Sequence, residues 1–130
     1  GACDMINFWA PETVPEKYKD RLFHRHNANV TLMRTNEDEC RAIGEWIGGK
    51  LNLCDGPVRF LIPEKGVSAL DREGGAFFDP EADAALFEAI ERTVTWTGNR
   101  KLIRLPLHID DPQFADAAVA AFRDITTKEP

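Results

Sequence analysis

The sequence predicts an α/β domain, a Rossmann-like half domain of three layers whose mainly parallel sheet has about four strands. Two observations lead to this fold class. Short apolar and β-branched segments alternate along the chain with longer segments in which apolar residues recur at helical spacing. Two of the longer segments begin with an aspartate followed by a proline, at Asp79-Pro80 and Asp111-Pro112, which is typical of a helix start. This order favours parallel strands joined by right-handed crossovers.

The first half of the chain contains two expected strands and one clear helix. Residues 3–8 are mainly apolar and suit a strand, and a proline-rich loop with a short helix near residues 16–21 follows them. Residues 30–33 suit a second strand because they are apolar or β-branched. Asn36 and Glu39 have the spacing of a capping box, and the helix that they begin has one apolar face.

The second half continues this alternation. Residues 58–62 form an expected buried strand, and the connection after it, residues 63–78, is long for an α/β unit. Long ordered loops often carry function. A helix that begins after Asp79, a strand over residues 101–107 and a helix capped by Asp111 complete the pattern.

Length and composition limit the protein class. The 130 residues, 43% of them hydrophobic, suit one domain over residues 1–130, and the abrupt apolar start predicts a fragment whose N-terminal part is missing. A net charge of −6 argues against general binding to nucleic acid or to an anionic membrane surface. Because no apolar run reaches the roughly 20 residues that span a bilayer, we expect a cytoplasmic protein. No metal site is predicted, since the three cysteines form no Cys-x-x-Cys pair and His24 and His26 would face opposite ways on a strand.

Polar residues that follow the expected strands are candidates for a ligand site, because the C-terminal ends of parallel strands share one edge of the sheet. Lys65, Gly66 and Ser68 combine a cation, a close backbone approach and a hydroxyl group. This combination suits a phosphate or a carboxylate, although the chain has no complete phosphate-binding motif. A surface turn with an exposed lysine explains the same three residues.

Further candidates follow the first two strands. Arg34 and Thr35 precede a helix whose free amides favour an anion. Alternatively, Thr35 caps that helix and Arg34 pairs with a nearby acidic residue of it. Asn7 and Glu12 follow the first strand and are additional candidates for the cleft.

An acid–base pair is the best catalytic candidate in the sequence. His108 and Asp110 follow the last expected strand, and a carboxylate can orient an imidazole for proton transfer. Ser68 would complete a triad by residue type, but it lacks the Gly-x-Ser-x-Gly turn that exposes such a nucleophile. The sequence therefore leaves open whether the protein catalyses a reaction.

Five segments, taken together and in order, resemble the Tm-one-like ATP-binding proteins, relatives of a plant protein that confers resistance to a tobamovirus. They are CDMINF (3–8), PETVPE (11–16), HNANVTLMRT (26–35), KGVSALD (65–71) and DPEAD (79–83). The resemblance implies the C-terminal part of the second domain of a two-domain Rossmann-like protein. It also implies binding of ATP, with Mg²⁺ as a possible companion, and a homo-oligomer as the expected assembly.

Three hypotheses follow for the function. The first is a module that binds a nucleotide or another small ligand and supplies one wall of a cleft, with the missing N-terminal domain as the other wall. The second is an enzyme that uses His108 and Asp110 on a phosphorylated or acidic metabolite. The third is a structural module whose open sheet edge serves dimerisation.

Overall fold

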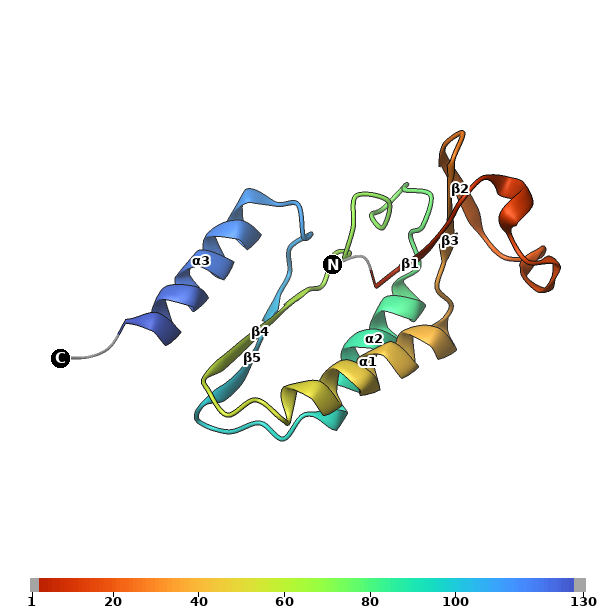
Figure 1. Cartoon of the computed structure of the whole chain (residues 1–130). Helices are drawn as coiled ribbons and strands as arrows, with labels where there is room; N and C mark the ends of the chain where they lie inside the picture. The colour runs from red at the N-terminus through yellow and green to blue at the C-terminus, as the bar shows by residue number, and fades with distance from the viewer. Residues whose placement is uncertain (1–2, 128–130) are drawn as a thin grey trace.

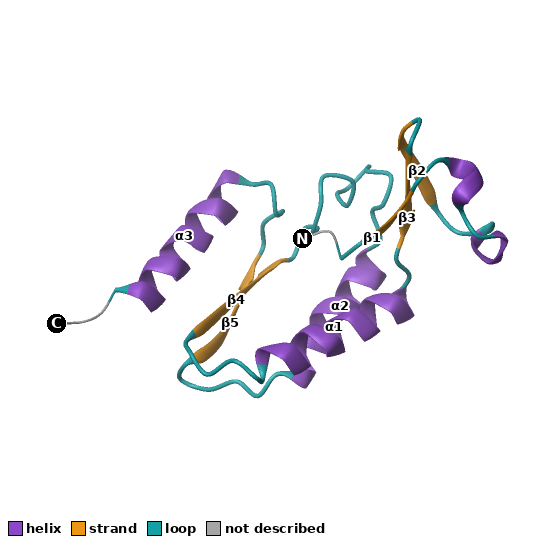
Figure 2. Cartoon of the chain, in the orientation of Figure 1, coloured by secondary structure: helices purple, strands orange, loops and turns teal. Residues whose placement is uncertain are grey.

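The computed structural model describes residues 3–127. Figure 1 and Figure 2 show two helices that run side by side, a hairpin at one end of them, and a third helix set apart at the other end of the molecule. The elements are β1 (Met5–Phe8), η1 (Pro11–Thr13), η2 (Glu16–Tyr18), β2 (Phe23–Asn27), β3 (Val30–Arg34), α1 (Glu37–Leu51), β4 (Val58–Pro63), α2 (Pro80–Thr93), β5 (Arg100–Leu105) and α3 (Pro112–Thr126).

The N-terminal strands form an antiparallel sheet in the order β1-β3-β2, so the expectation of one mainly parallel sheet of about four strands was wrong for this part of the chain. The reason is a tight turn. Asn27 pairs with Val30, and the side chain of Asn27 accepts a hydrogen bond from the backbone N–H of Asn29 at 2.9 Å. Such a short connection reverses the chain, whereas a parallel neighbour needs a crossover of about a dozen residues.

The C-terminal half has the α/β order that the sequence predicted. β4 and β5 pair in parallel from Val58–Arg100 to Pro63–Leu105, and α2 is the crossover between them. The observed parallel sheet has these two strands within residues 3–127, and the chain as a whole is a mixed α/β fold.

The expected helix starts are confirmed, and two of the three are capped as the sequence indicates. Asn36 and Glu39 form the capping box of α1, and Asp79 accepts from the backbone N–H of Ala82 at the start of α2. Asp111 precedes α3, but its side chain does not cap that helix. Instead, its Oδ2 accepts a hydrogen bond from the backbone N–H of His108 at 2.8 Å.

The core lies between the helices and the parallel strands. Its buried members come from α1, β4, the following loop and α2 with its C-terminal end: Cys40, Ile62, Val67, Ala82, Leu86, Phe87, Ile90 and Val94. α1 and α2 pack closely, since a Cβ atom added at Gly44 would lie 2.6 Å from the backbone O of Leu86. The absence of a side chain at this position therefore lets the two helices approach.

α3 is the most loosely attached helix. It packs on β4, on the opposite side from α1 and α2 (Figure 1), and Ala121 is its one fully buried residue among those described. Val119 and Phe122 on this helix are exposed. No helix within residues 3–127 is long and apolar enough to cross a membrane.

Candidate functional site

The connection between β4 and α2, residues 64–79, folds back on itself. Gly66 has a φ angle of 126°, and a Cβ atom there would lie 1.7 Å from the backbone O of Asp71. Asp71 in turn accepts a hydrogen bond at Oδ2 from the backbone N–H of Val67 at 2.8 Å, and its own N–H donates to the backbone O of Ser68. Phe77 near the end of the loop is fully buried. This loop has a fixed shape that requires glycine at position 66.

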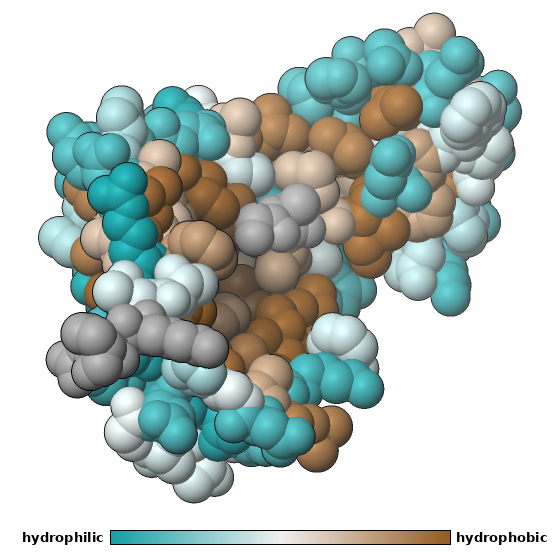
Figure 3. All heavy atoms as spheres, turned by 60° about the vertical axis from the view of Figure 1, so that its left-hand side comes forward, coloured by the Kyte–Doolittle hydropathy of each residue, from teal (hydrophilic) through white to brown (hydrophobic). Residues whose placement is uncertain are grey.

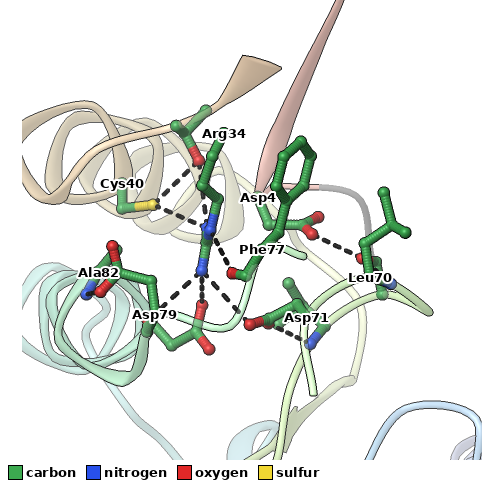
Figure 4. Close-up of polar contacts among 12 residues, drawn as sticks. Asp4, Arg34, Cys40, Leu70, Asp71, Phe77, Asp79 and Ala82 are labelled. Atoms are coloured by element: carbon green, nitrogen blue, oxygen red, sulfur yellow. Dashed lines mark hydrogen bonds and ion pairs between the residues drawn. The ribbon is translucent and has the colours of Figure 1, made fainter. Parts of the chain in front are cut away.

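A buried guanidinium group holds the loop against the rest of the domain. Arg34 at the end of β3 is 3% exposed, and its Nη2 lies 2.8 Å from Oδ1 of Asp83 and 3.4 Å from Oδ1 of Asp71. Its Nε donates to the backbone O of Phe77 at 2.9 Å, and Nη2 also reaches the backbone O of Asp79 at 3.4 Å. Figure 4 shows this guanidinium between the loop and the start of α2. We call Arg34, Asp71 and Asp83 the buried ion cluster.

A hollow of about 630 Å³ opens beside the buried ion cluster. Its lining combines basic, acidic and apolar side chains from the ends of β4 and β5, the loop, α2 and the segment before α3: Glu64, Lys65, Arg72, Glu73, Phe78, Pro80, Asp83, Ala84, Phe87, Arg104, His108 and Asp111. The charged groups of such a lining can orient a polar small molecule, and its apolar side chains can contact the apolar part of that molecule.

The cations of this lining differ in their availability. Arg72 lies 2.7 Å from a carboxylate oxygen of Asp110, and Arg104 lies 2.6 Å from one of Glu64. Lys65 is exposed, and its side chain forms no hydrogen bond or ion pair with any other residue between 3 and 127. Of the three cations, Lys65 is therefore the most available to a ligand.

Asp83 is the member of the buried ion cluster that lines the hollow. It is 6% exposed, and burial raises its pKa to about 7. The hydrogen bond from Arg34 lowers this pKa, and the neighbouring carboxyl group of Asp71 raises it. Asp83 therefore changes its protonation state near neutral pH, which is a common property of groups that transfer protons in enzymes.

His108 lines the hollow too, but both of its ring nitrogens have partners. Nε2 lies 2.9 Å from the backbone O of Ser68 and 3.0 Å from that of Asp71, so it must carry a proton and donate it. Nδ1 accepts from the backbone N–H of Asp110 at 3.1 Å. The ring is thus a neutral imidazole that holds the loop to the segment after β5.

The side chains of the expected acid–base pair are not joined by a hydrogen bond. Nδ1 of His108 lies 3.8 Å from Oδ2 of Asp110, and this carboxylate pairs with Arg72 instead. Ser68 also forms no triad, because its Oγ donates to Oδ2 of Asp4 at 2.5 Å while His108 contacts its backbone O. A catalytic role for His108 and Asp110 stays a prediction.

The other predicted ligand residues divide into two groups. Lys65 and His108 both line the hollow. Gly66 lies close to the ring of His108, since a Cβ atom at this position would lie 2.9 Å from Cδ2 of His108. Arg34 and Thr35 are buried behind the hollow.

Neither buried residue has the partner that the sequence suggested. Arg34 pairs with Asp71 and Asp83 and not with the acidic first turn of α1. Thr35 is not a helix cap, because its Oγ1 donates to the backbone O of Cys3 at 2.8 Å.

Asn7 and Glu12 lie outside this arrangement. In the antiparallel sheet, Arg34 at the end of β3 lies opposite Met5 at the start of β1. Because the two strands run in opposite directions, the residues of β1 after Met5 lie progressively farther from the end of β3. Both Asn7 and Glu12 are exposed and line neither the hollow nor its rim. Their expected place beside Lys65 depended on a parallel β1 and was wrong.

Sequence reasoning missed the two aspartates of the buried ion cluster. A signal for Asp83 exists, because it stands three and four residues before Leu86 and Phe87 and so falls on the apolar face of α2. An acidic residue on a buried helix face needs a cation or a proton. No comparable signal marks Asp71, whose place depends on the fold of the loop.

No group of three or more His, Cys, Asp or Glu side chains in residues 3–127 could hold a metal ion.

Replacement of Arg34 tests the buried ion cluster. Arg34→Met should lower the free energy of unfolding by about 3–5 kcal/mol, because two buried carboxyl groups lose their cation. Urea denaturation measures this change. Arg41→Met is the matched control, since Arg41 forms two ion pairs on the exposed side of α1 and its removal should change stability little. Equal losses in the two variants would contradict a special role for Arg34.

Comparison with known proteins identifies the family. The model of the uncharacterised protein family UPF0261, C-terminal domain, matches residues 1–126. A UPF0261 protein of Rhizobium meliloti (strain 1021) is 74% identical over 125 residues, which are 96% of this chain and 31% of that protein. A UPF0261 protein of Clostridium tetani is 45% identical over 117 residues, 90% of this chain and 29% of that protein.

The sequence similarity to a plant resistance protein is confirmed. The ToMV resistance protein Tm-1(GCR237) of Solanum lycopersicum is 40% identical over 128 residues, which cover 98% of this chain and 17% of that protein. The chain thus spans less than a third of the length of each of these relatives. It belongs to the uncharacterised protein family UPF0261 and corresponds to the C-terminal domain of that family.

Proposed function

We propose that this domain forms one wall of a cleft that binds ATP or a similar nucleotide, with Lys65 in contact with the phosphates. The observation that carries the proposal is the ammonium group of Lys65 at the rim of the hollow, which has no partner within residues 3–127. A phosphate group favours such a cation, because a charge-assisted hydrogen bond is stronger than a neutral one. The likeness to ATP-binding proteins that the sequence indicated is consistent with this ligand.

The apolar part of the hollow supports the same class of ligand. Phe78 lies in its lining and is 45% exposed, and Pro80 and Ala84 lie in the same lining. A nucleotide carries a flat base as well as a charged chain, so it can place the base against an aromatic ring and the phosphates near Lys65. Mg²⁺ would then be bound by the phosphates of the nucleotide.

Titration of the intact protein with ATP and magnesium tests the proposal. Lys65→Ala should weaken the affinity by about tenfold or more, because one charge-assisted contact to phosphate is lost. The fold should not change, since the side chain of Lys65 has no polar partner in residues 3–127. Lys101→Ala is the control, because Lys101 is an exposed lysine on β5 outside the lining of the hollow. Calorimetry that gives the same affinity for Lys65→Ala and wild type would exclude this role.

A second feature supports a cleft with two walls. An apolar hollow of about 420 Å³ lies between α3, β4, α2 and α1, and Figure 3 shows hydrophobic side chains gathered in a depression on this side of the molecule. Most of its lining is aliphatic or aromatic: Cys3, Ile47, Arg59, Phe60, Leu61, Ile62, Pro63, Val67, Leu86, Phe87, Ile90, Ile109, Phe114, Ala118, Ala121, Phe122 and Ile125. Phe122 in this lining is 63% exposed, and a large hydrophobic side chain left exposed beside an apolar hollow suits an interface.

We infer that the occupant of this apolar hollow is the part of the full-length protein that lies outside the 130 residues. Within residues 3–127, β4 pairs with β5 alone, whereas parallel strands are normally buried on both faces in larger sheets. The relatives are about three times longer or more, so they contain chain enough to add a strand beside β4 and to cover α3. This arrangement would bring the second wall next to the ligand hollow.

Charge placed in the apolar hollow tests this docking. Phe122→Glu in the intact protein should lower the free energy of unfolding by about 2–4 kcal/mol, because the charge would be buried at the interface. Val119→Glu is the control, since Val119 is exposed on α3 outside the lining. Equal tolerance of both changes would contradict docking. Sedimentation would show whether Phe122→Glu instead splits a dimer into monomers, which would make a second copy the occupant.

A further inference from the structure

The charges of the buried ion cluster do not balance when both aspartates are ionised. One guanidinium group, that of Arg34, faces two carboxyl groups, and all three side chains are at most 9% exposed. The other donors of Arg34 are directed at the backbone O of Phe77, the backbone O of Asp79 and the hydroxyl group of Thr35. A buried excess of negative charge is costly, so the cluster is expected to keep one proton.

Hydrogen bonds indicate which carboxyl group keeps this proton. Both oxygens of Asp71 act as acceptors, Oδ1 from Arg34 and Oδ2 from the backbone N–H of Val67, so Asp71 is suited to the ionised form. Asp83 accepts at Oδ1 from Arg34. Asp83 also forms a side-chain hydrogen bond with Asp71, and a hydrogen bond between two carboxyl groups requires a proton on one of them. Asp83 is also the member of the pair that lines the hollow.

We propose that Asp83 keeps this proton and donates it in a hydrogen bond to an oxygen of a phosphate group bound in the ligand hollow. The proton stays on Asp83, so no covalent bond breaks, and one carboxylate remains for the one guanidinium group of Arg34. The ligand class that fits is a phosphate group, because its oxygens are strong hydrogen-bond acceptors. The inference rests on the proposed binding of a nucleotide in the same hollow.

Other charged groups around Asp83 set the conditions for this hydrogen bond. Arg34 comes from β3, Asp71 from the loop and Cys40 from α1, and burial raises the pKa of Cys40 so that the thiol stays neutral. The hollow adds basic and acidic groups on its other sides: Glu64, Lys65, Arg72, Glu73, Arg104, His108 and Asp111. Lys65 can bind the phosphate while protonated Asp83 donates a hydrogen bond to it, because both line the same hollow.

The protonation state of Asp83 can be measured without any ligand. In the intact protein, the ¹³C chemical shift of its Cγ atom should titrate with a midpoint at about 7. In Asp71→Asn, Asp83 is the one carboxyl group of the cluster that remains paired with Arg34, so the titration midpoint of Asp83 should fall below about 5. A wild-type midpoint below about 5 would overturn the proposal. This measurement does not depend on a variant that might fail to fold.

The second measurement adds ATP with magnesium as the probe. Above pH 7 wild-type Asp83 must take up a proton to serve the phosphate, so the affinity should weaken by about tenfold per pH unit. In Asp83→Asn the affinity should not vary in this way. An equal pH dependence in both proteins would overturn the role of Asp83 and leave ATP binding intact. Absence of ATP binding at every pH would overturn both proposals.

Discussion

The guanidinium group of Arg34 joins parts of the chain that lie far apart in the sequence. It extends from the end of β3 and contacts Asp71 and Phe77 in the long loop, and Asp79 and Asp83 at the start of α2. These contacts connect the antiparallel sheet to the α/β part of the domain. Because the pairs are almost fully buried, removal of the cation would leave charge without compensation, and the arrangement is far more sensitive to this residue than to any surface ion pair.

The same cluster determines the shape of the ligand hollow. Asp71 fixes the turn after Gly66 through the N–H of Val67, and His108 closes the turn from the other side through two backbone carbonyl groups. Lys65 is thereby held at the rim of the hollow and Asp83 in its wall. A loop that would otherwise be free to move is thus fixed by buried polar contacts, which is how a binding site gains a defined geometry.

The sequence predicted those parts of the fold that depend on local rules. Asn36, Glu39 and Asp79 mark helix starts because capping is a local interaction, and the parallel pairing of β4 with β5 follows from the helix between them. The direction of β1 depended on a turn of two residues that was not recognised, so Asn7 was placed at the wrong edge. The buried ion cluster depends on contacts across more than 35 residues of sequence, and no local pattern identifies such partners.

The central claim is that Arg34 holds the loop that shapes the hollow, and native-state hydrogen exchange tests this claim most directly. In Arg34→Met, the amides of Val67 and Phe77, which donate to Asp71 and Leu70, should lose protection by about tenfold or more. Amides in the second half of α2 should lose less, since that part of the helix lies away from Arg34. Unchanged protection in the loop, or an equal loss at all these amides, would contradict the account.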